Sequence, residues 1–192
     1  MALLTAYLIL GHLLGDFVFQ PSKLVVWKNK SLLGLSVHIL IHLTINFLIL
    51  LPLILQNPWI ITLILTIYAT HFLIDHAKIS YESKKKPKNN LPPFLIDQIL
   101  HLIIIAVGII AAAKSNYTLQ TVDLHLYYTM LETPIFLSLL IVATNGLTIY
   151  QYESARTKTK VNFLSEPNLT RATILLAVFY LYLSSGNLLL LR

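Results

Sequence analysis

The sequence predicts an all-α membrane protein, a single bundle of about six transmembrane helices. Of its 192 residues, 56% are hydrophobic and only 11% are charged, whereas ordinary soluble domains carry about 25% charged residues. The apolar runs approach the roughly 20 residues that a helix needs to cross a bilayer. They cover residues 2–20, 33–52, 58–78, 93–113, 134–151 and 170–191. Cysteine is absent, which excludes thiolate metal ligands and a cysteine nucleophile.

Prolines and one asparagine mark the ends of these runs. Pro21 follows the first run, and Pro52 and Pro58 are predicted to flank a short turn between the second and third. Pro134 opens the fifth, in agreement with the tolerance of proline in a first helical turn. Asn168 or Thr170 could cap the sixth. The first run lacks a basic leader and a cleavage site, so we expect it to be retained as a helix.

The basic residues predict the orientation of the bundle. Loops rich in lysine and arginine stay in the cytoplasm. All of these residues except Lys114 and Arg192 lie near the ends of the first, third and fifth runs. The residues near these ends are Lys23, Lys28, Lys30, Lys78, Lys84, Lys85, Lys86, Lys88, Arg156, Lys158, Lys160 and Arg171. Both termini are therefore predicted to lie outside the cytoplasm. The net charge of +6 is accounted for by this pattern, and we expect no nucleic-acid partner.

Each of the first four runs carries a pair of ionisable residues four positions apart. Residues at this spacing share one face of a helix, and they are costly in hydrocarbon unless they face the interior of the bundle. We therefore expect the pairs to face one another. The pairs are His12 with Asp16, His38 with His42, His71 with Asp75, and Asp97 with His101.

The four pairs are also predicted to lie at one depth. At about 1.5 Å per residue, the two members of each pair lie roughly 5–8 Å and 11–14 Å from the cytoplasmic end of their run. This agreement is informative because the helix direction alternates while the order of the residues in the pairs also changes. It predicts a single site that opens toward the cytoplasm.

Imidazole and carboxylate ligands together suit zinc, manganese, iron or nickel, and we expect zinc first. The eight paired residues could hold one ion with supporting carboxylates, or two ions that share an aspartate. A catalytic ion lowers the pKa of its bound water to about 7. Asp16 or Asp97 could then act as the general base, and Gln20 or Lys78 could orient a phosphate or carbonyl oxygen at the rim.

Several residues also have simpler interpretations. Asp75 and Lys78 could form an ion pair at the membrane interface. His76 falls on a different face of its helix from the pair in the same run and is expected at the surface. Asn145 is expected to serve helix packing more than a hydrogen bond into the site.

Four sequence blocks resemble a bacterial family of multi-pass membrane proteins, the domain of unknown function 3307. The blocks are His12-Leu-Leu-Gly-Asp-Phe-Val-Phe-Gln20 with Trp27-Lys28-Asn29-Lys30, His38 with His42, His71-Phe-Leu-Ile-Asp75 with Lys78, and Phe94-Leu-Ile-Asp-Gln98 with His101. The resemblance covers roughly residues 1–125 and implies a bacterial inner-membrane location without an activity. Residues 126–192 are then two additional scaffold helices. The chain also has a looser likeness to membrane-embedded metal-dependent hydrolases, whose spans carry His and Asp pairs as well; this is an analogy between kinds of site only.

Three functions remain open. The leading hypothesis is a metal-dependent hydrolase of a lipid or lipid-linked phosphate or ester at the cytoplasmic leaflet. The second is a small cation or proton permease, disfavoured because the outer halves of runs two to four are almost entirely leucine and isoleucine. The third is a non-catalytic or haem-binding subunit, because two histidines on different helices can ligate haem. Membrane lipids are the expected partners, and the oligomeric state stays open.

Overall fold

The computed structural model describes residues 1–87, 89–114, 130–154 and 165–189, with side chains up to residue 183. All regular structure in these ranges is helical, and they contain no strand. The helices, with two π-helical segments labelled η, are α1 (Ala2–Leu13), η1 (Leu14–Val18), α2 (Ser22–Lys28), α3 (Leu32–Gln56), α4 (Trp59–Lys85), α5 (Leu91–Lys114), α7 (Glu132–Ile141), η2 (Val142–Gly146), α8 (Leu147–Ser154) and α9 (Glu166–Leu189). The predicted all-α class is confirmed.

Four helices are long and apolar enough to cross a membrane: α3, α4, α5 and the continuous segment Glu132–Ser154. A fifth span is possible if α1 and η1 are taken together with α2, although α2 bends away by 95°. The described part of α9 does not meet the same criterion of length and hydropathy. The protein is thus an all-α membrane protein with four or five such helices, and the count of six stays a prediction.

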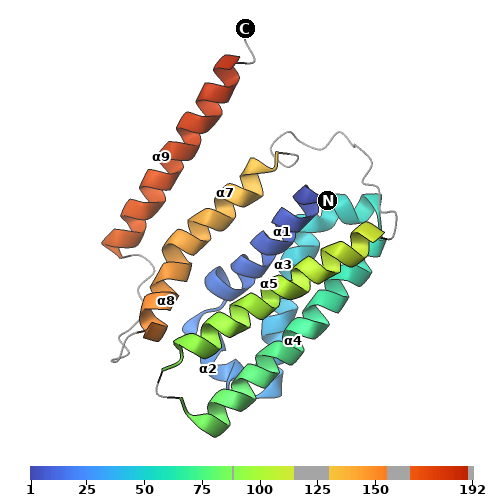
Figure 1. Ribbon diagram of the computed structural model, residues 1–192, viewed down its shortest axis with the longest axis vertical. Helices are drawn as coiled ribbons and strands as arrows, with labels where there is room; N and C mark the ends of the chain where they lie inside the picture. Colours follow the sequence, from blue (N-terminus) through green and yellow to red (C-terminus); the bar gives the residue numbers. More distant parts are fainter. Residues whose placement is uncertain (88, 115–129, 155–164, 190–192) are drawn as a thin grey trace.

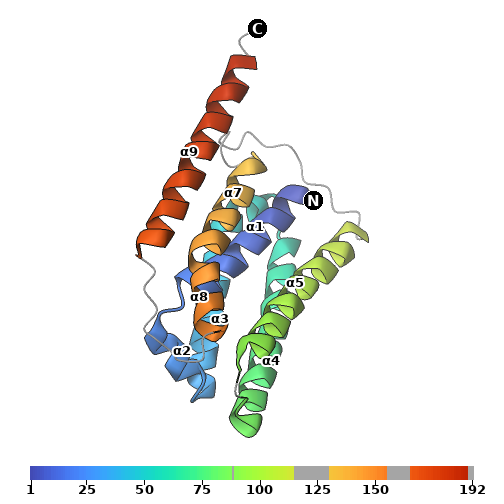
Figure 2. The same ribbon diagram turned by 60° about the vertical axis from the view of Figure 1, so that its left-hand side comes forward.

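The bundle is built from α1, α3, α4 and α5, which lie side by side in Figures 1 and 2. The segment α7–η2–α8 packs along α1, and α9 packs on η2 and α7 at the outside of the bundle. Figure 1 places α2 and the turn between α4 and α5 at one end, with the N-terminus at the other. The lysines in α2 and in the last turn of α4 therefore share the end that the charge pattern predicts to be cytoplasmic.

The half of the bundle away from these lysines has an apolar core. Leu4, Leu8, Leu50, Ile60 and Ile64 are each 0% exposed. They come from the first half of α1, the last part of α3 and the start of α4. The eight residues of the four predicted pairs lie in the other half of the bundle and are also buried.

Two local features differ from the prediction. Pro52 lies inside α3, which continues to Gln56, so it does not flank a turn. Burial of Leu53 and Ile54 holds this last turn in place, although proline removes one hydrogen bond from it. The predicted loop after the first run contains α2, which begins after Pro21 and buries Leu24.

Candidate functional site

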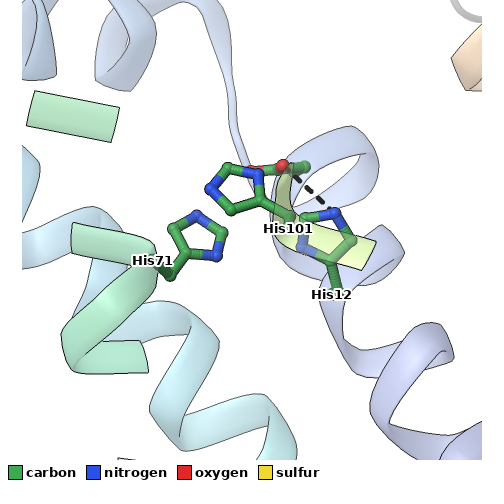
Figure 3. A group of neighbouring side chains, drawn as sticks. His12, His71 and His101 are labelled. Atoms are coloured by element: carbon green, nitrogen blue, oxygen red, sulfur yellow. Dashed lines mark ion pairs between the residues drawn. The ribbon is translucent and has the colours of Figure 1, made fainter. Parts of the chain in front are cut away.

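The structure brings together all eight residues of the four predicted pairs, and none of them is more than 5% exposed. We refer to them as the His/Asp cluster. Figure 3 shows three of its histidines, His12, His71 and His101, which come from α1, α4 and α5 and turn their rings toward one another. A small cleft beside them is lined by these three rings, by Tyr68 and by isoleucines of α4 and α5. Five imidazoles and three carboxylates thus share one buried interior.

Asp16 is placed in the cluster by the π-helical turn η1. The N–H of Phe19 donates to the carbonyl of Leu14 at 2.8 Å, five residues back. Because a π turn contains an extra residue, Asp16 is displaced around the helix axis, and such turns are frequent at functional sites. Its carboxylate meets α3, with Oδ1 lying 3.2 Å from Nε2 of His38 and 3.2 Å from Nε2 of His42.

Glycine allows α1 and α3 to approach closely enough for these contacts. A Cβ atom on Gly15 would overlap the imidazole of His42, and one on Gly11 would overlap the side chain of Asn46. Asn46 in turn donates to the main-chain carbonyl of His42 at 3.1 Å and to the hydroxyl of Tyr68. Asn46 and Tyr68 therefore close the cluster on the side of the apolar core.

Two lysines reach the carboxylates from the opposite side. Nζ of Lys28, on α2, lies 3.1 Å from Oδ2 of Asp75, and Nζ of Lys78 lies 3.0 Å from Oδ2 of Asp97. Asp75 thus pairs with Lys28, and the alternative pair of Asp75 with Lys78 is not the one that forms. The side chain of Lys78 is 22% exposed, so the site reaches the surface at this edge.

Many buried nitrogens and one oxygen of the cluster have no hydrogen-bond partner. These include both ring nitrogens of His12, His38 and His101, and Oδ1 of Asp97. Nε2 of His38 lies near Asp16 but off the direction of a hydrogen bond. A buried polar atom left in this state costs about 1–3 kcal/mol, whereas coordination of a metal ion would satisfy it.

The spacing of the donor atoms also fits a metal ion. Three overlapping groups have ligand atoms that all lie within 4.8 Å of one another, close to the spread of roughly 4 Å around one ion. The groups are His12, Asp16, His71 and His101; Asp16, His38, His42 and His71; and Asp75, Asp97 and His101.

The remaining predicted residues lie at the margins. Gln20 donates to the main-chain carbonyl of Asp16 at 3.1 Å and so supports η1. His76 is exposed on α4, as expected. Asn145 donates to the carbonyl of Phe17 at 2.8 Å, so it makes a hydrogen bond between helices, the role that was expected less than packing.

Four residues that contact the site were not predicted from the sequence. Gln98 donates to Oδ2 of Asp16 at 3.1 Å, and Lys28, Asn46 and Tyr68 make the contacts described above. Asn46 follows His42 by four residues, so an extension of the pair on α3 by one more turn would have found it. Lys28 carried no such signal because its segment was interpreted as a loop.

Comparison with known proteins adds a family but no activity. Residues 4–128 match the family described as "Protein of unknown function (DUF3307)". No curated protein and no solved structure matches the chain. The matched range runs from α1 through α5 and contains every member of the His/Asp cluster. The chain belongs to the DUF3307 family.

Proposed function

We propose that this protein is a membrane-embedded, metal-dependent hydrolase that cleaves a phosphate or ester bond of a lipid or lipid-linked molecule at the cytoplasmic leaflet of a bacterial inner membrane. The observation that carries this proposal is the burial of five imidazoles and three carboxylates together, with ring nitrogens that lack hydrogen-bond partners. Ionisable side chains are costly inside a membrane protein, and where they occur they mark functional sites. A divalent ion, zinc first and manganese or iron next, would satisfy these donors.

The residues of the site would divide the chemistry as follows. The ion would supply Lewis acidity and a water of lowered pKa. Asp97 suits the role of general base because Lys78 and Gln98 hold its Oδ2 while Oδ1 has no partner; Asp16 is the other candidate. The general base would take a proton from the water as the water oxygen bonds to phosphorus or to the carbonyl carbon. The bond from that atom to the lipid oxygen would then break, and the departing oxygen would take the proton from the base.

The charges at the edge of the site favour an anionic substrate. Lys28 and Lys78 are the cations nearest to the carboxylates among the described residues, and both lie at the end that carries the other lysines. A phosphate group that approaches from this end meets positive charge before it meets the aspartates. Gln20 and Lys78 lie at the rim, where they could orient a phosphate or carbonyl oxygen.

A lipid substrate is supported by the surface beside η1. A groove of about 610 Å³ lies where η1, α2 and α3 meet. Its lining residues are Val18, Phe19, Pro21, Lys23, Leu24, Trp27 and Ile41. Val18 is only two residues from Asp16. An acyl chain in the groove would keep its headgroup close to the cluster.

The alternative functions receive less support. Beyond Asn46 and Tyr68, the interior is filled by fully buried apolar side chains such as Leu50, Ile60 and Ile64, whereas a permease needs polar residues through the full thickness. A haem between two histidines needs open space, but the rings of His71 and His101 stack at 3.7 Å.

The test is hydrolysis by purified protein in vesicles that contain phosphatidate, a polyprenyl diphosphate or diacylglycerol. We expect turnover that is lost on chelation and restored by zinc or manganese. Asp97→Asn should lower the rate at least about 100-fold, the usual contribution of a general base. His76→Ala, which changes an exposed histidine on the same helix as His71, is the matched control. Absence of turnover, together with gradient-driven metal or proton movement, would establish the permease instead.

A further inference from the structure

The five histidines of the cluster form a compact group around His71. Its ring centroid lies 4.5 Å from that of His42 and 3.7 Å from that of His101, and 5.7 Å and 5.5 Å from those of His38 and His12. His38 lies 4.6 Å from His42, and His12 lies 5.1 Å from His101. The imidazoles therefore form two neighbouring pairs, His38 with His42 and His12 with His101, that both contact His71.

Asp16 faces both pairs of histidines, one oxygen to each pair. Its Oδ1 lies 3.2 Å from Nε2 of His38 and of His42. Its Oδ2 lies 3.7 Å from Nε2 of His12 and accepts a hydrogen bond from Gln98. One carboxylate oxygen thus belongs to each pair of histidines.

Asp75 repeats this arrangement. Its Oδ2 lies 3.4 Å from Nε2 of His38 and 3.8 Å from Nε2 of His71, and its Oδ1 lies 3.7 Å from Nε2 of His101. Two carboxylates from different helices therefore each turn one oxygen toward His38 and the other toward His12 or His101, as bridging ligands do between two ions.

The number of donors exceeds what one ion requires. A catalytic zinc ion takes three protein ligands and an open position, whereas the cluster presents five imidazoles in addition to its carboxylates. Two of the candidate groups contain four residues each, and they share only Asp16 and His71. The unshared members, His38 with His42 and His12 with His101, are the two pairs of histidines.

We propose that the site holds two divalent ions bridged by the carboxylates of Asp16 and Asp75. One ion lies with His38 and His42, and the other lies with His12 and His101, with His71 available to either. The inference rests on the proposed function only in requiring that the cluster binds metal. Paired ions about 3.5–4 Å apart stabilise both the attacking and the leaving oxygen of an in-line displacement, which is the chemistry that a phosphate ester requires.

The test counts ions in the full-length protein. Metal-free protein in detergent is loaded with Zn²⁺ for elemental analysis and with Mn²⁺ for electron paramagnetic resonance. We expect two ions per chain and a manganese spectrum of an exchange-coupled pair, with hyperfine spacing half that of an isolated ion. His76→Ala should keep both ions. His42→Ala and His12→Ala should each retain one ion and lose the coupling, and His42→Gln repeats the test with most of the bulk preserved.

The outcomes separate this inference from the proposed function. One ion per chain with the spectrum of isolated manganese would overturn the paired site and leave a single-metal hydrolase standing. Two ions without magnetic coupling would overturn the bridging role of Asp16 and Asp75. Absence of both metals from the unmodified protein would overturn the paired site and the proposed function together.

Discussion

Lys28 connects a short surface helix to the interior of the bundle. Its Nζ lies 3.1 Å from Oδ2 of Asp75, a residue 47 positions later in the chain, and the two side chains are 10% and 2% exposed. Removal of one partner from a buried pair is strongly destabilising because it leaves a charge without compensation. This contact therefore bears both on the position of α2 and on the charge of the site.

We predict that Lys28→Ala lowers the free energy of unfolding of the metal-free protein by about 3 kcal/mol, at the lower end for a broken buried pair. Lys30→Ala, two positions later and exposed, should change it little. Thermal unfolding of both variants in detergent measures the difference. Equal melting temperatures for the two variants would show that the pair of Lys28 with Asp75 does not hold α2.

Gly15 tests the close approach of α1 and α3. We predict that Gly15→Ala displaces the imidazole of His42, which occupies the space of the new methyl group, and lowers metal content by about half in a paired site. Gly146→Ala is the matched control, because its Cβ would meet its nearest neighbours at 3.7–3.8 Å, an ordinary contact. Unchanged metal content in Gly15→Ala, measured by elemental analysis, would exclude His42 as a ligand.

At this scale the sequence predicted the eight residues of the cluster but not all of their partners. Spacing of four residues reports which side chains share a helix face, so His38 and His42 were found together. It does not report contacts between helices, so the bonds from Gln98 and Lys28 to the aspartates were missed.

Among the elements, the two π-helical segments contact each other through one hydrogen bond. Asn145 in η2 donates to the carbonyl of Phe17 in η1 at 2.8 Å. This carbonyl lies next to Asp16, so the bond supports the turn that aims the carboxylate. A segment outside the matched family range thus holds a segment inside it.

We predict that Asn145→Ala reduces stability by about 1 kcal/mol, the net value of one hydrogen bond, and also lowers metal affinity because η1 loses support. Thr144→Ala is the control, since the hydroxyl of Thr144 donates to the carbonyl of Leu140 one turn earlier in the same segment. Metal titration and thermal unfolding measure the two effects. Equal metal affinity in both variants would show that η1 is held by other contacts.

Most element boundaries followed from hydropathy, and the exceptions have physical causes. The extra residue of η1 leaves no trace in a pattern of apolar residues, because a π turn changes the angle and not the composition. Pro52 was taken as a helix end, but burial of Leu53 and Ile54 continues α3 beyond it. The helix α2 was missed because seven residues are too few to show a period.

For the whole molecule, composition and apolar run length were sufficient to predict an all-α membrane bundle. Convergence of the cluster also followed, because helices that alternate in direction bring residues of equal depth to one layer. The number of membrane spans was harder to predict from the length and hydropathy of the apolar runs. The break after η1 and the position of α9 outside the bundle depend on packing and not on hydropathy.

The orientation of the bundle is open to a direct test because the chain contains no cysteine. We predict that a thiol at Lys84→Cys, in the last turn of α4, reacts with an impermeant maleimide only after the membrane is opened. A thiol at Pro58→Cys, between α3 and α4 and exposed, should react when that membrane is intact, since excess lysine marks the cytoplasmic end. The reverse pattern would place the His/Asp cluster at the outer leaflet and exclude a substrate from the inner one. A cysteine appended after Arg192 reports on α9: labelling across an intact membrane indicates a sixth span, whereas protection indicates that the bundle has five.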